Sequence, residues 1–253
     1  MSAPALSVVI PVHNEAENIG PLVEEVRRSL AGRVAYEIVL VDDASTDATP
    51  ARIDSLAASL PEVRVIRHGR NAGQSTAVRS GVHAARGALI ATLDGDGQND
   101  PADLPRLLAR YEAESDGGVL MVAGHRTTRK DTAVTRLSSR VANVVRGALL
   151  GDHTPDTGCG LKLFPRALFL AFPYFDHMHR FLPALTIRAG GRVVSEPVSH
   201  RPRTRGRSHY GIHNRLWVGI VDLVGVLWLL RRARHPEARE ITAQGSSPIP
   251  GKR

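Results

Sequence analysis

The sequence predicts an α/β fold, with a mostly parallel sheet flanked by helices. Short apolar runs that suit buried strands alternate with longer segments whose apolar residues recur at helical spacing. Four such strand–helix pairs precede a fifth strand, and polar residues directly follow each of the first four strands. Alternation of this kind is typical of a doubly wound sheet whose crossovers are right-handed.

The predicted elements follow one another without an internal repeat. Strands are predicted at Leu6–Val12, Tyr36–Val41, Val63–Arg67, Leu89–Leu93, Val119–Ala123, Leu161–Phe164 and Arg192–Val198. Helices are predicted from Ile19 to Leu30, from Gln74 to about Ala85, from Pro101 to Tyr111, from Val134 to Leu149 and from His179 to Ala189. A further helix is predicted after the polar turn at 42–47, and it ends at about Leu60.

The composition limits the partners and the compartment. A length of 253 residues with 42% hydrophobic residues supports one large domain with a real core. The net charge of +8 indicates anionic partners, which are nucleic acid, phospholipid headgroups or phosphorylated small molecules. The single cysteine, Cys159, excludes an internal disulfide and a cysteine-only zinc site. Because Ser7–Ile10 reads as a core strand and not as a secretion signal, a cytoplasmic location is expected.

Asp94 and Asp96 directly follow the strand that begins at Leu89. Residues two apart in an extended chain point to the same side, so both carboxylates can lie together at the carboxyl end of this strand. Open α/β sheets bind ligands at that edge. Mg2+ and Mn2+ prefer oxygen ligands such as these carboxylates, and the side chain of Gln98 offers a third, neutral oxygen ligand. The alternative is an acidic turn in which Asp100 only caps the next helix.

A second polar cluster, Asp42, Asp43, Ser45 and Asp47, follows the strand from Tyr36. A carboxylate here can accept hydrogen bonds from a ribose hydroxyl or a base N–H, which predicts nucleoside binding. The alternative is that the serine caps the next helix while Asp47 favours its dipole. Polar residues also end the first and third strands, at His13–Glu15 and His68–Arg70, so several polar turns are expected to meet at one edge of the sheet.

Four short motifs occur in the order and spacing of family-2 glycosyltransferases. They are Pro11–Glu15, Asp42–Asp47, Asn71–Gln74 and Asp94–Gln98. Over about residues 6 to 210 the chain most closely resembles the dolichol-phosphate mannosyltransferases and their bacterial polyprenyl-phosphate glycosyltransferase relatives. The resemblance implies a GT-A (Rossmann-like) fold, a nucleotide-sugar donor, a divalent cation and inversion at the anomeric carbon. His13 departs from the pattern, because many relatives have tyrosine or phenylalanine there.

The resemblance also implies roles for individual residues. A uridine or guanosine pocket would be lined by Pro11, Asn14, Glu15, Asp42 and Asp43, with Ser45, Gly73 and Gln74 as further substrate-binding candidates. Mg2+ or Mn2+ would be held by Asp94, Asp96 and Gln98 against the donor diphosphate. That cation, together with arginines, would neutralise the charge that builds on the leaving diphosphate.

The arginines are the next candidates. Arg126 follows the fifth strand and can help to neutralise the diphosphate, unless it and the nearby Arg129–Lys130 form a solvated basic loop. The relatives have a loop that would close over the donor. The stretch that contains Arg205, Ser208 and Tyr210 matches this loop, with one basic residue inserted. Arg180 is a further substrate-binding candidate. Arginine forks bind phosphate bidentately, whereas the ordinary alternative is a charged surface run.

Asp156 precedes a turn of small residues, Thr157–Gly160. In relatives with hydroxyl acceptors the corresponding aspartate is a candidate general base. A lipid phosphate is already anionic near neutral pH, so with that acceptor Asp156 would orient the sugar or the acceptor. Cys159 is expected to be a small packing residue and not a nucleophile.

Leu216–Leu230 is an apolar stretch that contains Asp222 and has arginines at its ends. At ~1.5 Å per residue it reaches roughly 22 Å, less than a ~30 Å hydrocarbon core. It is interpreted as an interfacial or partner-binding helix, and a core helix is the alternative. The predicted organisation is a transferase domain over 1–212, this helix within 213–235 and a disordered tail over 236–253.

The leading hypothesis is an inverting glycosyltransferase of cell-envelope glycan biosynthesis. It would move a sugar from GDP-mannose or a UDP-hexose to a polyprenyl or dolichyl phosphate, at the cytoplasmic membrane face. Its partners would be a membrane surface or a separate membrane protein, with a homo-oligomer left open. The first alternative is a saccharide or other hydroxyl acceptor with Asp156 as base. The second is a basic nucleic-acid-binding protein, which the aromatic content of 4% and the strand-end aspartates disfavour.

Overall fold

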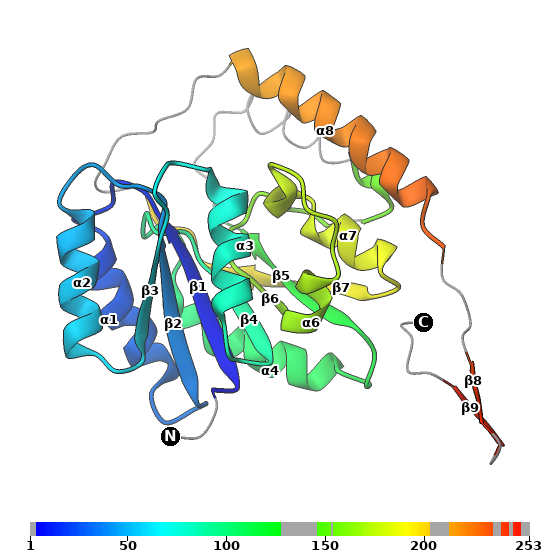
Figure 1. Ribbon diagram of the computed structural model, residues 1–253, viewed down its shortest axis with the longest axis horizontal. Helices are drawn as coiled ribbons and strands as arrows, with labels where there is room; N and C mark the ends of the chain where they lie inside the picture. The colour runs from blue at the N-terminus through cyan, green and yellow to red at the C-terminus, as the bar shows by residue number, and fades with distance from the viewer. Residues whose placement is uncertain are drawn as a thin grey trace.

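The computed structural model describes residues 4–127, 146–152, 154–202, 213–234, 239–242 and 245–248. Its centre is a seven-stranded sheet of order β3-β2-β1-β4-β6-β5-β7 (Figure 1). The strands are β1 (Leu6–Val12), β2 (Tyr36–Asp42), β3 (Val63–Arg67), β4 (Leu89–Thr92), β5 (Leu120–Arg126), β6 (Lys162–Pro165) and β7 (Arg192–Val198). The predicted α/β fold with a mostly parallel sheet is confirmed.

One strand runs against the others. β1 pairs in parallel with β2 and β4, β2 with β3, and β5 with β7, whereas β6 is antiparallel to both β4 and β5. The reversal places Lys162 beside Thr92 of β4 and Ala123 of β5. The sequence did not predict this direction, because the apolar pattern of a short strand is the same read either way.

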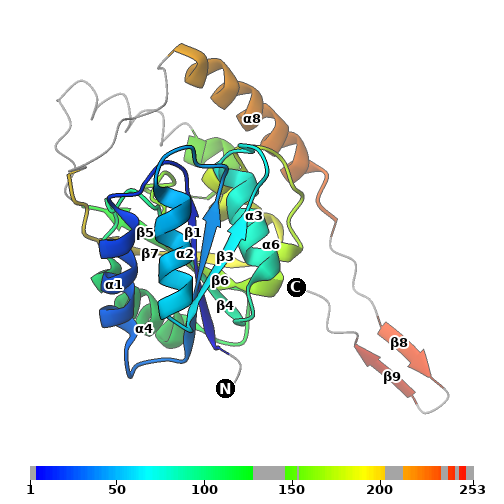
Figure 2. The same cartoon turned by 60° about the vertical axis from the view of Figure 1, so that its left-hand side comes forward.

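Helices cover both faces of the sheet (Figures 1 and 2). They are α1 (Ile19–Leu30), α2 (Thr49–Ser59), η1 (Pro101–Asp103), α4 (Leu104–Glu114), α3 (Gln74–Ala84), α6 (Arg166–Leu170), η2 (Met178–Arg180) and α7 (Leu182–Arg188). Buried side chains of α1, α2 and α4 form one core cluster with the sheet, and those of α3, α6 and α7 form a second cluster. Because both faces are covered, the central strands read as continuous apolar runs.

Two predicted helices differ in detail. The helix predicted from Pro101 begins as the short η1 turn, which Asp100 caps by accepting from the Ala102 N–H at 2.9 Å. The helix predicted from His179 is divided into η2 and α7. The helix predicted over 134–149 lies mostly outside the described residues. The part that is described, from residue 146 on, is helical up to residue 150.

Helix α8 (His213–Arg231) packs on the domain through Val226 and the partly buried Leu223, Leu227 and Leu230. Val226 is buried in a third cluster with Leu150, Phe181 and Ala184. On the other side Val221, at 68% exposed, lies near further exposed apolar residues, Val224 and Trp228. Among the described residues, no helix combines the length and the hydropathy needed to cross a membrane.

The C-terminal segment contains a two-stranded hairpin apart from the main sheet. β8 (Arg239–Thr242) pairs antiparallel with β9 (Gly245–Pro248). The sequence predicted no ordered structure here, so the structure differs at these eight positions. Strands of four residues leave only a weak sequence signal, and an isolated hairpin is marginal in water.

Candidate functional site

The polar turns after β1, β2, β3 and β4 meet at one edge of the sheet, at the top of Figure 1. The parallel register explains this, since Val12 lies opposite Asp42 and Asp42 lies opposite Arg67. The carboxyl ends of neighbouring strands therefore stand side by side, as the sequence predicted.

Asp42 and Asn14 join the first two of these turns. The Asp42 carboxylate, 1% exposed, accepts from the Ser45 N–H at 2.9 Å and from Arg67 Nε at 3.0 Å. Asn14 adopts a left-handed backbone (φ 57°), which asparagine tolerates better than most residues. Its N–H donates to Ser45 Oγ at 3.0 Å, and its Oδ1 accepts from the Thr46 N–H at 2.8 Å. These contacts hold the two turns together without a ligand.

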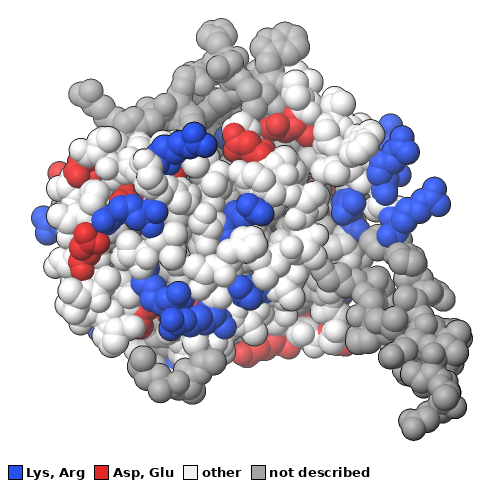
Figure 3. Space-filling model, viewed as in Figure 1, with Lys and Arg blue, Asp and Glu red and all other residues white. Residues whose placement is uncertain are grey.

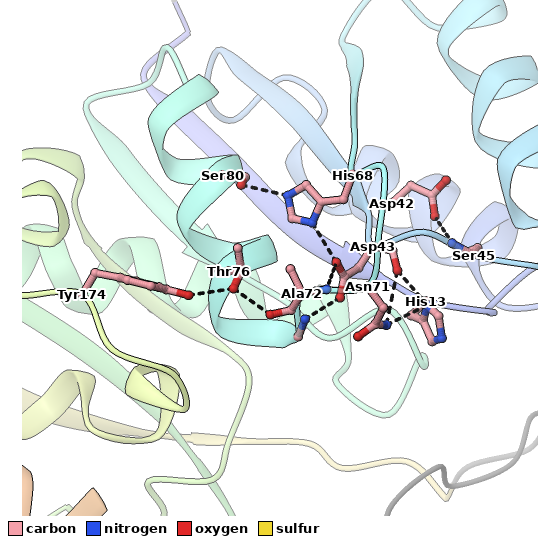
Figure 4. Close-up of polar contacts among 11 residues, drawn as sticks. His13, Asp42, Asp43, Ser45, His68, Asn71, Ala72, Thr76, Ser80 and Tyr174 are labelled. Atoms are coloured by element: carbon pink, nitrogen blue, oxygen red, sulfur yellow. Dashed lines mark hydrogen bonds and ion pairs between the residues drawn. The ribbon is translucent and has the colours of Figure 1, made fainter.

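Asp43 fixes the turn that precedes α3 (Figure 4). Its Oδ1 accepts from the Ala72 N–H at 2.9 Å, and its Oδ2 accepts from the Gly73 N–H at 2.8 Å. Gly73 has a φ of 85°, a conformation that other residues seldom adopt, and α3 begins at the next residue. The Asp43 carboxylate, which is 4% exposed, therefore holds this turn in place through hydrogen bonds within the protein.

Glu15 faces the start of α1. Its N–H donates to Thr49 Oγ1 at 2.9 Å, and its Oε2 accepts from Asn18 Nδ2 at 2.5 Å. Glu15 and Asn14 also line a cavity of about 480 Å3 that reaches Arg52 of α2. A volume of this order fits a small ligand.

The structure brings Asp94 to Gln74 and Gly160. Gln74 Nε2 donates to Asp94 Oδ1 at 2.8 Å, so the first turn of α3 touches the end of β4. A Cβ at Gly160 would lie 2.1 Å from Asp94 Oδ2, so only glycine allows the carboxylate to rest there. Thr92 Oγ1 donates to the Gly160 carbonyl at 2.6 Å and so fixes the backbone against which the Asp94 carboxylate packs.

Asp94 and Asp96 form an electrostatically unfavourable pair. Burial, and then the charge of Asp96, raise the pKa of Asp94 to about 6. Asp96 Oδ1 accepts from the Gln98 N–H at 3.1 Å. A divalent cation would offset both the burial and the repulsion, so the two carboxylates fit the predicted Mg2+ or Mn2+. No group of three or more His, Cys, Asp or Glu side chains that could hold a metal occurs among the described residues. Water and donor phosphates would complete the coordination.

Arg126 and Asp156 form a bidentate ion pair. Arg126 Nε donates to Asp156 Oδ2 at 2.6 Å, and Arg126 Nη2 donates to Asp156 Oδ1 at 2.8 Å. These bonds raise the pKa of Arg126, and the guanidinium is fixed in orientation. The charges of Lys162, and then of Arg126, lower the pKa of Asp94, so this ion pair lies within electrostatic reach of the acidic site.

Lys162 is a charged residue of the site that the sequence analysis missed. It is 3% exposed, and its Nζ donates to the carbonyls of Thr157 and Cys159. Burial lowers the pKa of this ammonium. The signal was present, because only three lysines occur in the sequence and Lys162 stands inside the apolar stretch 161–164. A charge in such a strand is uncommon unless it is paired.

His179 is the second missed residue. Ser75 Oγ lies 2.7 Å from His179 Nδ1, and the same oxygen accepts from the His179 N–H at 3.3 Å. Burial lowers the pKa of His179 to about 3, so its ring is neutral. His179 and Lys162 line a cavity of about 30 Å3, enough for one or two water molecules.

The remaining predicted residues are placed only in part. Pro11 is half-buried on β1 opposite Val41, and Arg180 is half-buried in η2. Arg205, Ser208 and Tyr210 lie outside the described residues, as does the Arg129–Lys130 pair. Their roles, and the ligand contacts of every other candidate above, stay predictions.

Comparisons with known proteins found one matching family and several similar proteins. A model of glycosyl transferase family 2 matches residues 7–171. A dodecaprenyl-phosphate galacturonate synthase of Rhizobium johnstonii is 36% identical over 91% of this chain and 69% of that protein. An undecaprenyl-phosphate 4-deoxy-4-formamido-L-arabinose transferase of Edwardsiella ictaluri is also 36% identical, over 82% of this chain and 63% of that protein. The chain thus spans about two thirds of the length of these relatives.

A solved structure shares the fold at lower identity. Glucosyl-3-phosphoglycerate synthase from Mycobacterium tuberculosis, in complex with Mn2+, UDP-glucose and phosphoglyceric acid, superposes with a TM-score of 0.68. The match covers 98% of this chain and 88% of that one at 18% sequence identity. At this identity the similarity concerns the fold, which is the predicted GT-A type.

Proposed function

Since this chain belongs to glycosyl transferase family 2, we propose that it moves a sugar from a nucleotide-diphosphate donor to the phosphate of a polyprenyl phosphate, with inversion and with Mg2+ or Mn2+. The observation that carries the proposal is the Asp94–Asp96 pair at the end of β4, whose mutual repulsion a cation bound to a diphosphate would relieve. The polyprenyl-phosphate names of two relatives at 36% identity support the acceptor class.

In this proposal the residues of the chain bind and orient the reactants. Asp94 and Asp96 would hold the cation, and Gln74 orients the Asp94 carboxylate by donating to its Oδ1 at 2.8 Å. When bound, the cation neutralises the charge that develops on the leaving diphosphate. Arg126 supplies a second positive charge, which Asp156 fixes in direction. Preorganised charge of this kind stabilises a leaving group without reorganisation during the reaction.

The ion pair of Asp156 favours a lipid phosphate over a hydroxyl acceptor. A general base must reach the proton that it removes, yet both Asp156 oxygens accept from Arg126. A phosphate acceptor needs no such base, because it is already anionic near neutral pH. We expect Asp156→Asn to lower turnover about tenfold by loosening Arg126, without the loss of the acidic limb, the fall in rate at low pH, in the pH–rate profile. Complete loss of that limb would instead support the hydroxyl-acceptor alternative.

Helix α8 is the part that would contact the membrane surface. Its outward apolar side chains, Val221 and Trp228 among them, lie near three exposed arginines at its end, Arg231, Arg232 and Arg234. Figure 3 shows basic side chains gathered where α8 ends. Apolar and basic groups together suit an interface with anionic lipid.

Product analysis tests the proposal. The protein is incubated with a panel of UDP- and GDP-sugars and a short polyprenyl phosphate, and the lipid fraction is examined by mass spectrometry. We expect a glycosyl polyprenyl phosphate from at least one donor, its loss with EDTA and its recovery with Mn2+. A protein that binds no sugar nucleotide and forms no glycolipid from any donor would contradict the proposal.

A further inference from the structure

A chain of hydrogen bonds runs from Ser80 of α3 through His68 to Asp43, directly after β2 (Figure 4). His68, just after β3, lies with Nε2 at 2.9 Å from Ser80 Oγ and Nδ1 at 2.7 Å from Asp43 Oδ1. None of the motifs that identified the family contains His68 or Ser80. The Asp43 carboxylate in turn accepts from the N–H groups of Ala72 and Gly73.

The direction of these bonds follows from the chemistry of the groups. Asp43 accepts two backbone N–H bonds, so its carboxylate is the acceptor for His68 as well, and Nδ1 of His68 is the donor. In the neutral ring Nε2 is then an acceptor, and the Ser80 hydroxyl donates to it. Each side chain in the series is thereby held by the next one.

The series ends at the acidic site. Gly73 is followed by Gln74, whose side chain donates to Asp94 Oδ1 at 2.8 Å. The turn at 71–73 is therefore fixed on one side by Asp43 and delivers the partner of Asp94 on the other side. Partners that orient a carboxylate ligand commonly change metal affinity or activity by about 10- to 100-fold when they are removed.

We propose that His68 is a positioning residue, which holds Asp43 against the 71–73 turn and thereby keeps Gln74 on Asp94. The coupling to metal and turnover rests on the proposed function, whereas the effect on the turn does not. His68 would contact no reacting atom. It would set the direction of a group that contacts the cation site.

The same three side chains resemble a Ser–His–Asp triad, but the surroundings of Ser80 favour positioning. Ser80 lies in the middle of α3 (Gln74–Ala84), where backbone N–H groups are used within the helix. A serine nucleophile needs N–H donors directed at the developing oxyanion. The Asp43 carboxylate is also already occupied by the turn.

Amide hydrogen exchange tests the first step directly. In His68→Ala we expect the amides of Ala72 and Gly73 to exchange about tenfold faster, because their acceptor loses its support. His68→Asn, whose side-chain amide can donate in place of Nδ1, should restore most of the protection. His83→Ala is the matched control, since His83 is an exposed histidine of α3, the helix that carries Ser80. Equal exchange in His68→Ala and His83→Ala would overturn the proposal.

A double-mutant cycle tests the second step. Mn2+ binding in the presence of UDP is measured by calorimetry, and turnover is measured alongside. His68→Ala should weaken Mn2+ binding about tenfold in the parent protein and less than about twofold in a Gln74→Ala background. A general loss of stability would give the same factor in both backgrounds, and that result would overturn the coupling. If the parent protein bound no Mn2+ and transferred no sugar, the proposed function would fail, while amide exchange would still decide the role of His68.

Discussion

Two pairs of aspartates stand at the same edge of the sheet in opposite environments. Asp42 and Asp43 are almost fully buried, and N–H groups, Arg67 and His68 occupy their oxygens. The second pair, at the end of β4, has fewer donors, and its mutual repulsion helps to raise the pKa of Asp94. The first pair is satisfied by the protein, whereas burial and the charge of Asp96 outweigh the nearby charges of Lys162 and Arg126 at the second pair. The contrast separates residues that build the site from residues that await a ligand.

The largest expected effect comes from neutralising the second pair. Asp96→Asn and Asp94→Asn should each lower metal-dependent turnover about 100- to 1000-fold, because a donor diphosphate would lose its bound cation. Steady-state kinetics over a range of Mn2+ concentrations measures this effect. Turnover close to that of the parent protein in both variants would remove the metal assignment.

The same Asp94→Asn change should stabilise the metal-free protein. The folded-state pKa of about 6 lies above the ordinary value of 3.8, so the folded protein holds the proton more tightly. The unfavourable charge therefore costs stability above pH 6, and the cost disappears as the pH falls towards 4. Asp94→Asn should add about 2 kcal/mol to the free energy of unfolding at pH 7.5 and almost nothing at pH 4. Denaturant melts at the two pH values with EDTA measure this difference.

Asp43→Asn should have the opposite effect on stability. An amide supplies one acceptor oxygen where the carboxylate supplies two, so the Ala72 or Gly73 N–H loses its partner. Losing a charge-assisted bond and leaving a donor unpaired should lower the free energy of unfolding by about 2–3 kcal/mol. Denaturant melts compare this variant directly with Asp94→Asn. Equal signs for the two variants would show that the aspartate pairs do not differ as described.

Gly160→Ala sharpens the contrast by moving Asp94 without changing a charge. The added methyl group would lie 2.1 Å from Asp94 Oδ2, so the carboxylate must turn away. We expect a loss of about 10- to 100-fold in apparent Mn2+ affinity. Gly20→Ala in α1 is the control, because its added methyl group meets nothing within 4 Å. A change of similar size in both variants would indicate a general effect of the substitutions.

The smallest expected effect concerns α8. Val221→Glu with Val224→Glu places charges on its outward side, where both residues are more than half exposed. Sedimentation with anionic vesicles should fall severalfold, while transfer to a detergent-dissolved acceptor stays close to that of the parent protein. Unchanged sedimentation would favour a protein partner or an oligomer for this surface.

Much of the site could be predicted because its signals are local. Asp94 and Asp96 share a strand end, and the motifs at Asp42 and Gln74 follow other strands of the predicted sheet. Lys162 and His68 could not be assigned in the same way. Lys162 donates to carbonyls of its own turn, but it lies beside the end of β4 only because β6 runs antiparallel to β4. His68 reaches Asp43 across 25 positions of the chain.

The sequence by itself determined the alternation of strands and helices, the acidic residues at the strand ends and the apolar C-terminal helix. Local spacing and polarity decide these features, because they depend on neighbours within a few residues. Only the tertiary structure decided which carboxylates are already satisfied. Asp42, Asp43, Asp94 and Asp96 look alike in the sequence. Their difference comes from burial and from partners contributed by Arg67, α3 and the turn at Gly160, which the packing of distant segments brings together.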